Sequence, residues 1–430
     1  MRVVVAVVAL LLATTVAIAQ EFKFDLSEIE KRPYEFGGFI EGRGELFRLD
    51  PDSAFYLLND PRGTQGTRND RGTGLMELHG RYTRDIVDFG LRLQASGEHD
   101  ADEGEASDVT VLDGGLTVRP STDRRFDLGK QVMKWGKGYA WNPVGFVERT
   151  KDPTDPDLSR EGFWMLSGDA VWSLDGPVRT VGLTPVLLPV STAMNKGFGR
   201  SEGVNPALKL YLLAFDTDVD FMVLTGGTRT ARYGADFSRN LAPNFEIHGE
   251  AAHIADSERR VLGPDERPLV RRKDAINWLF GLRYLSDAET TYIAEYNRNG
   301  TGFTEDEGGD FFNFTKDAAE TFLSTGSAAR LNRANTLSQG GFSQPNPFRN
   351  YVHVRISQKE PFDILYLTPT ITMIANVDDH SLTLGPELVY TGFTNWEFRL
   401  KGAVNIGSDE TEFGEKRAAA RLEFRVRRFF

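Results

Sequence analysis

Polar and apolar residues alternate with a period of two along most of the chain. Residues 75–83 and 87–96 show the pattern clearly, and only a short connection centred on Asp85 separates them. Such alternation places one class of side chain on each face of a β-strand, and so short a connection is typical of a hairpin. The pattern therefore predicts an antiparallel all-β fold. Further hairpins are expected at 207–215 with 219–224, 276–285 with 290–296, and 366–376 with 381–390.

The predicted hairpins are joined by longer polar connections. Short turns that alternate with long loops are typical of outer-membrane barrels, which keep the turns periplasmic and the loops extracellular. The alternating segments predict roughly 16–18 strands, and aromatic residues near the strand ends would form the interface girdles. We therefore expect a transmembrane antiparallel β-barrel from residue 34 to residue 430. The predicted loops are residues 59–71, 98–108, 137–160, 191–205, 256–273 and 299–349.

The last ten residues form the clearest strand. Apolar residues with one parity alternate with charged residues of the other parity, so one face suits hydrocarbon and the opposite face suits water. This strand must pair with the first, expected near residues 34–45, because hydrocarbon does not tolerate an open sheet edge. A terminal Phe430 in such a strand looks like the signal by which the barrel-assembly machinery of Gram-negative bacteria recognises its substrates. The apolar set is Leu422, Phe424, Val426 and Phe430, and the charged set is Arg421, Glu423, Arg425 and Arg427.

The N-terminus has the pattern of an export signal. Met1 and Arg2 precede an apolar stretch from residue 3 to residue 13, and Ala17-Ile18-Ala19 forms a small-x-small cleavage site. We expect a signal peptide over residues 1–19 and a periplasmic stub over residues 20–33. An uncleaved inner-membrane anchor is the alternative, because residues 3–19 approach the lower length limit for a spanning helix.

Composition narrows the function further. The chain has 50 basic and 62 acidic residues, and loss of Arg2 with the leader would change the formal charge from −12 to −13. An acidic balance argues against a nucleic-acid partner. The absence of cysteine excludes disulfides, thiolate metal sites and a cysteine nucleophile, and we expect no cofactor. No linker divides the mature chain, so one large domain is expected.

Many charged residues share the parity that would face the barrel interior. Charges on the lipid face would be costly, so these side chains would line an aqueous pore as a wall that sorts solutes by sign. Salt bridges that fill a narrow barrel are the alternative. The wall becomes basic toward the last two strands, which weakly favours anions. The candidate pore-lining residues are Glu77, Arg81, Asp88, Arg92, Glu246, Glu250, Arg283, Glu295, Arg355, Arg399, Lys401, Arg421, Arg425 and Arg427.

Several motifs occur in the order found in one group of proteins. Gly129-Lys130-Gln131 and Trp135-Gly136 are followed by Asn142-Pro143 and Asp152-Pro153. This order resembles a family of porin-like outer-membrane proteins, most of them uncharacterised. The resemblance implies a barrel and a porin-like role, but it names no substrate. Lys130 departs from the commoner Arg. Later agreements are Ala294-Glu295-Tyr296-Asn297 with Gly300 and Gly302, and residues 376–381, where Val377-Asp378-Asp379-His380 also departs from the family pattern.

Residues 135–156 are the candidate constriction loop. Three aromatic side chains would be poor choices for a wholly exposed loop, so the loop is expected to fold inward or to pack over the barrel rim. A short helix is predicted within residues 316–332 of the longest loop. The candidate constriction residues are Trp135, Lys137, Tyr139, Trp141, Glu148 and Arg149.

Three weaker signals carry little functional weight. Residues 199–203 match the letters Gly-x-Ser-x-Gly, but the strand and helix that a nucleophile elbow requires are not predicted around them. His248 and His253 have opposite parity, so they would face opposite sides of a strand. The acidic run 98–105 could bind calcium, but it is more typical of a solvated loop tip.

Together these patterns predict a porin-like outer-membrane channel for the passive passage of small hydrophilic solutes or ions. Its partners would be outer-membrane lipid, the barrel-assembly machinery and those solutes. The alternative is a barrel scaffold that exports a polymer or encloses a partner protein such as a multihaem cytochrome. An enzyme in the barrel wall is a third class, and the sequence favours it least.

Overall fold

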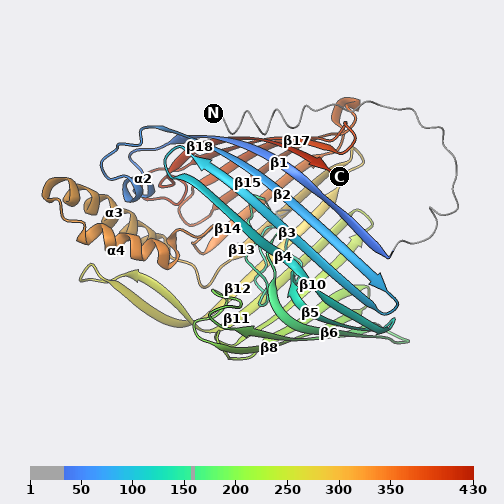
Figure 1. Ribbon diagram of the computed structural model, residues 1–430. Helices are drawn as coiled ribbons and strands as arrows, with labels where there is room; N and C mark the ends of the chain where they lie inside the picture. The colour runs from blue at the N-terminus through green and yellow to red at the C-terminus, as the bar shows by residue number, and fades with distance from the viewer. Residues whose placement is uncertain (1–32, 156–159) are drawn as a thin grey trace.

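The computed structural model describes residues 33–155 and 160–430, which form one closed antiparallel barrel of 18 strands (Figure 1). Strands adjacent in sequence are adjacent in the wall, and β1 pairs with β18 to close it. The strand number lies within the predicted range. The predicted signal peptide, and the stub except for Pro33, lie outside the described residues. The strands are β1 (Tyr34–Leu49), β2 (Arg68–Arg84), β3 (Val87–Asp100), β4 (Gly104–Ser121), β5 (Arg124–Gln131), β6 (Phe163–Ser173), β7 (Val178–Val190), β8 (Gly203–Ala214), β9 (Thr217–Leu224), β10 (Arg232–Ala242), β11 (Phe245–Leu262), β12 (Pro268–Leu285), β13 (Thr290–Arg298), β14 (Asn350–Gln358), β15 (Leu367–Asn376), β16 (Leu382–Tyr390), β17 (Trp396–Ile406) and β18 (Ala418–Phe429).

The seam between the first and last strands confirms the predicted closure. The register pairs Phe39 with Phe429 and Leu46 with Leu422. Beyond β18, the Phe430 amide donates to the Gly38 carbonyl at 3.0 Å, and the Gly38 amide donates to the Phe430 carbonyl at 3.1 Å. The wall therefore has no free edge at this seam.

The two faces of the wall differ as the alternation predicted. On β18, Leu422 is 48% exposed and Phe424 is 52% exposed, whereas Glu423 is only 2% exposed. The neighbouring Glu41 of β1 is also buried. The wall therefore has apolar side chains outside and charged side chains inside, which is the reverse of a soluble domain. Such an outer face is suited to contact with lipid hydrocarbon.

The predicted alternation of short turns with long loops is wrong at three places. The predicted loop at 98–108 is mostly strand, with a turn of only three residues, 101–103. The predicted loop at 256–273 is mostly the extended tip of the β11–β12 hairpin. The turn at Asp378 and Asp379 lies at the same end as the long loops, because strand direction alternates. The parts of the strands that extend beyond the membrane keep their backbone hydrogen bonds but no longer need an apolar face. Their sequence therefore lacks the alternation and resembles that of a loop.

Helices α2 (Ala54–Asn59), α3 (Glu305–Thr325), α4 (Ala329–Leu337) and the π-helix η2 (Ser338–Phe342) gather at the loop end of the barrel, whereas the 3-10 helix η3 (Pro361–Asp363) lies in the β14–β15 connection at the opposite end (Figure 1). Two helices replace the single one predicted within 316–332, and the first begins earlier, with Thr304 and Glu307 forming a capping box. This helix ends at Gly326, whose φ of 74° suits glycine. No helix of the described residues is long and apolar enough to cross a membrane.

Candidate functional site

The segment between β5 and β6 enters the barrel, and Glu250 of β11 holds its first part. The Glu250 carboxylate accepts hydrogen bonds from the amides of Lys137 at 2.6 Å, Gly138 at 2.6 Å and Val144 at 3.2 Å. An irregular backbone cannot satisfy these amides itself, so a wall carboxylate supplies the acceptors. We call residues 132–155 the inner loop.

Glu295 of β13 forms a second anchor next to the first. Its two oxygens accept hydrogen bonds from the amides of Tyr139 at 2.5 Å and Ala140 at 2.8 Å. His248 lies at 0% exposure with its Nε2 2.9 Å from Glu295 Oε1. His253 is well exposed beside Asp274, so the two histidines face opposite sides of the wall as their parity predicted. Glu250 and Glu295 therefore lie beneath the inner loop and do not border open space.

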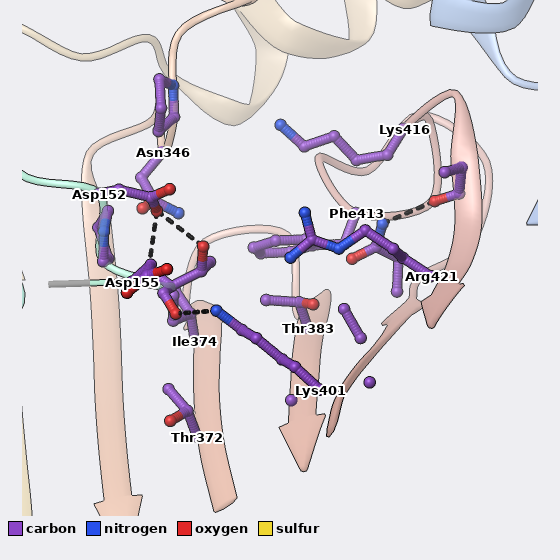
Figure 2. A pocket seen from close by; sticks show the side chains of 18 of the residues that line it. Asp152, Asp155, Asn346, Thr372, Ile374, Thr383, Lys401, Phe413, Lys416 and Arg421 are labelled. Carbon is purple, nitrogen blue, oxygen red and sulfur yellow. Dashed lines mark hydrogen bonds between the residues drawn. The ribbon is translucent and has the colours of Figure 1, made fainter. Parts of the chain in front are cut away.

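The far end of the inner loop reaches the wall near the seam. Lys401 Nζ of β17 donates to the Thr154 carbonyl at 2.6 Å, and Figure 2 shows Lys401 extending toward this part of the loop beside Asp155. Arg425 of β18 lies 3.3 Å from Asp155. Burial alone would raise the pKa of Asp155, but the charges of Lys401, Arg425 and Arg399 outweigh it and hold the pKa below its ordinary value. The inner loop is thus fixed to two separate parts of the wall, β11–β13 and β17–β18, and it crosses the lumen between them.

The middle of the inner loop packs against an apolar part of the wall. Trp135 and Phe146 are buried in a cluster with side chains of β6 to β9 and β11, including Met165 and Leu188. Of the two arrangements that the aromatic residues left open, this packing corresponds to inward folding and not to packing over the rim. Because Trp135 is only 2% exposed, it supports the constriction and does not line it.

Glu148 serves the same supporting purpose. Its carboxylate accepts the Trp135 amide at 2.9 Å and pairs with Arg160 at 3.0 Å. Burial raises the pKa of Glu148, and the charges of Arg160 and Lys151 only partly oppose the effect.

Of the other constriction candidates, Lys137, Tyr139 and Trp141 contact wall strands through their side chains, whereas Arg149 contacts the same β5–β6 segment. Lys137 Nζ lies 2.9 Å from Asp220 of β9, and although burial would lower the pKa of this lysine, Asp220 raises it above its ordinary value. Tyr139 directs its hydroxyl to Glu246 at 3.4 Å. The remaining two are Trp141, with its ring 5.8 Å from that of Tyr351, and Arg149, which pairs with Glu161 at 2.5 Å.

Three hollows surround the inner loop inside the barrel, with volumes of about 460, 490 and 720 Å³. The 460 Å³ hollow lies between inner-loop residues 152–155 and the wall of β14 to β18, and Figure 2 shows Lys401 and Arg421 among its side chains. The 490 Å³ hollow is bordered by β2 to β6. The largest of the three, of about 720 Å³, lies between the inner loop and three connections at the loop end of the barrel. We call these connections, which border the hollow with residues 197–200, 299–303 and 340–347, the outer loops. The lumen is therefore narrowed but retains space on several sides of the inner loop.

Most of the candidate pore-lining charges form ion pairs with neighbours on the inner face, as the salt-bridge alternative expected. Glu250 and Glu295 bind the inner loop, and Lys401 binds its backbone. Within the described residues, Arg81 and Arg355 form no ion pair within 4.0 Å, and each borders a hollow. The pairs are Glu77–Arg92, Asp88–Arg119, Arg92–Asp113, Glu246–Arg283, Arg399–Glu387, Arg421–Glu45, Arg425–Glu423 and Arg427–Glu41.

Sequence reasoning missed several residues of this site. Asp220 and Asp236 are buried beside Lys137, and Asp220 stands between two apolar neighbours in a strand, so parity alone could have found it. Asp155 was missed because it lies in a loop, where parity has no meaning. Among the described residues, no group of three or more His, Asp or Glu side chains is placed to hold a metal ion. Within the acidic run 98–105, Asp102 forms an ion pair with Arg417 at 2.7 Å.

Comparisons with known proteins support the fold. No family model matches the sequence, and no curated protein is similar to it. Among solved structures, Acinetobacter baumannii OccAB4 aligns with a TM-score of 0.53 and 8% identity over 93% of this chain and 99% of its own. Pseudomonas aeruginosa OccK3 (OpdO) aligns at 0.52 and 12% over 92% and 96%, and OccK11 (OpdR) at 0.51 and 12% over 92% and 95%. At these identities the likeness establishes a shared barrel architecture.

Proposed function

We propose that the protein is an outer-membrane, porin-like channel through which small hydrophilic solutes or ions pass passively. The observation that carries the proposal is a closed barrel with an apolar outer face, a charged inner face and hollows on several sides of an inner loop. The charged inner face is compatible with water and hydrophilic solutes, and the apolar outer face is compatible with lipid. The barrel architecture shared with OccAB4, OccK3 and OccK11 is consistent with the proposal.

The inner loop favours a channel over a scaffold. It is attached to β11–β13 by Glu250 and Glu295 and to β17–β18 by Lys401. A polymer or a partner protein threaded through the barrel would have to break these contacts, whereas a small solute can pass beside the loop. The protein therefore acts through selection by size and charge at the inner loop.

The roles of individual residues follow from this assignment. Lys137, Tyr139 and Arg149 of the inner loop, with the charged wall residues opposite, would set the narrowest part of the path. Arg355 and Arg81 would contribute positive charge that no described carboxylate neutralises. Phe430 would act in assembly as the C-terminal signal.

Reconstitution of the purified, folded barrel into a planar lipid bilayer tests the proposal. We expect discrete conductance steps in potassium chloride, and protein unfolded by heat before addition should give none. Membrane fractionation of Gram-negative cells should place the protein in the outer membrane. A correctly folded barrel that never conducts would contradict a channel and would favour the scaffold alternative.

A further inference from the structure

The connection between β14 and β15, residues 359–366, exposes an apolar surface at the end of the barrel opposite the long loops (Figure 1). Phe362 is 94% exposed, and Ile364, Leu365 and Tyr366 are between 47% and 61% exposed. A single exposed apolar residue is ordinary, but a contiguous group indicates a surface that contacts lipid or protein. Within the described residues, no other turn at this end presents more than one exposed large apolar side chain. We call residues 359–366 the apolar turn.

Hydrogen bonds fix the shape of the apolar turn. The Glu360 amide donates to the Leu367 carbonyl at 2.8 Å, and the Tyr366 amide donates to the Glu360 carboxylate at 2.9 Å. Four residues of the turn have a left-handed backbone although none is glycine, with φ from 48° at Glu360 to 65° at Tyr366. Such conformations are costly for residues with a side chain, and they persist where the surrounding structure imposes them. The apolar turn is therefore an ordered element that presents its apolar side chains outward.

The apolar turn adjoins the apolar outer face of the wall. The Thr391 amide, in the turn between β16 and β17, donates to the Tyr366 carbonyl at 3.1 Å. Phe393 of that turn is 59% exposed, and its ring lies 5.9 Å from the ring of Phe398. Phe398 shares its strand parity with Leu400, an exposed residue of β17, so both lie on the outer face. The exposed surface is thus continuous with the face that contacts lipid.

The charged residues of the apolar turn limit how deeply it can enter a membrane. Asp363 is exposed between Phe362 and Ile364, and Lys359 is exposed beside Glu289. A charge in hydrocarbon is costly, whereas water and lipid headgroups reach it at the membrane interface. Aromatic and aliphatic side chains are also favourable at the interface. The composition of the turn therefore suits the interfacial layer and not the hydrocarbon core.

We propose that the apolar turn is a membrane anchor, which inserts Phe362 and Leu365 into the interfacial layer of the phospholipid leaflet on the periplasmic side. Turns at this end of an outer-membrane barrel are periplasmic. Insertion removes apolar area from water, and the turn supplies this area beyond the ends of the strands that form the wall. The anchor holds the β14–β15 sector of the barrel at a fixed depth in the membrane.

Thiol labelling tests the anchor, because the chain has no cysteine of its own. Phe362→Cys and Leu365→Cys each place one thiol in the apolar turn, and Ala288→Cys is the control, because Ala288 is exposed in the polar turn between β12 and β13. The folded variants are placed in phospholipid nanodiscs, which leave both membrane faces open to solution. Each variant then reacts with a negatively charged maleimide, and its rate is divided by the rate of the same variant after unfolding. We expect Phe362→Cys and Leu365→Cys to react about tenfold or more slowly than Ala288→Cys, the ratio for partition of one large apolar side chain out of water.

Quenching by lipid identifies what protects the thiol. A fluorophore attached to unfolded Phe362→Cys, which is then refolded into nanodiscs, should be quenched by phospholipid that carries a spin label near the top of its acyl chain. Equal labelling rates in all three variants would place the turn in water and overturn the anchor. Slow labelling without quenching would mean that a second copy or another segment of the chain covers the turn, and it would also overturn the anchor. Should Phe362→Cys fail to give a heat-modifiable barrel, the same two measurements on Leu365→Cys decide the question.

Discussion

Removal of the Glu250 side chain should weaken the attachment of the first part of the inner loop to the wall. The Glu250→Ala substitution deprives the amides of Lys137, Gly138 and Val144 of their shared acceptor. Hydrogen bonds to a charged group contribute about 1.5–3 kcal/mol each when buried, but lumen water would replace part of that, so we expect a loss of about 2–4 kcal/mol. A loss of this size changes the ratio of attached to detached loop by about 30- to 1000-fold.

Single-channel recording measures this effect directly. A loop that detaches for a substantial fraction of the time should give a larger and noisier conductance than the natural protein gives. The barrel itself should resist heat and detergent as before, because the strand ladder does not include this carboxylate. Glu77→Ala is the matched control, since Glu77 of β2 is also a buried carboxylate of the inner face, but it pairs with Arg92 at 3.7 Å and, within the described residues, accepts no hydrogen bond from the inner loop.

The refuting result is equally specific. If Glu250→Ala conducts with the same amplitude and noise as the natural protein, the wall carboxylate does not hold the loop. A conductance change of equal size in Glu77→Ala would attribute the effect to wall charge and not to loop anchoring.

Three further predictions follow from the described contacts. Replacement of Phe430 by Asp should sharply reduce folded protein in the outer membrane while export across the inner membrane continues, and normal amounts of heat-modifiable barrel would contradict its assembly role. Glu412, in the loop between β17 and β18, accepts hydrogen bonds from Tyr351 at 2.6 Å and Asn376 at 3.1 Å, which dock residues 407–417 on β14 and β15. Burial raises the pKa of Glu412 to about 7, with Lys416 opposing the shift, so this docking should weaken as pH rises from about 4.5 to about 7. Hydrogen exchange of that loop checks the sign, and Glu412→Gln should abolish the dependence. Asp155→Asn should leave Arg425 less neutralised and shift the reversal potential in a salt gradient toward chloride, and an unchanged potential would show that this pair lies outside the ion path.

The wall of the barrel was predictable from sequence because lipid enforces a simple rule on every strand. The last strand illustrates this, since its alternation gave the face of each charge and the need to close the sheet gave the partner strand. The hairpin tip at 256–273 was not predictable, because both of its faces meet water and the alternation disappears. The start of α3 was missed for a different reason, as Gly308 and Gly309 weaken the helix signal, whereas burial of Phe311 in the outer-loop core stabilises the helix.

The site was predictable only in part. The aromatic residues of 135–156 predicted that the segment is not freely exposed, and the structure places it inside the barrel. Its anchors were not predictable, because Gly138 and Glu250 lie 112 residues apart and nothing in either local pattern specifies their contact. Glu250 has the same parity as the other wall charges, so sequence assigned it to the pore wall. In the structure its carboxylate is covered by the inner loop, because it accepts hydrogen bonds from three loop amides, and no sequence pattern predicts those contacts.

The seam between β1 and β18 has a consequence for the order of folding. Gly38 and Phe430, which exchange two backbone hydrogen bonds, are 392 residues apart. Bringing such distant residues together costs about 5 kcal/mol of chain entropy on the logarithmic loop-closure relation, and contacts of this range slow folding. The hairpins can form locally and early, but β1 has no second neighbour until the chain through Phe430 is available. Synthesis and barrel completion are therefore separate events, and during the interval between them the unpaired edge of β1 is prone to aggregation.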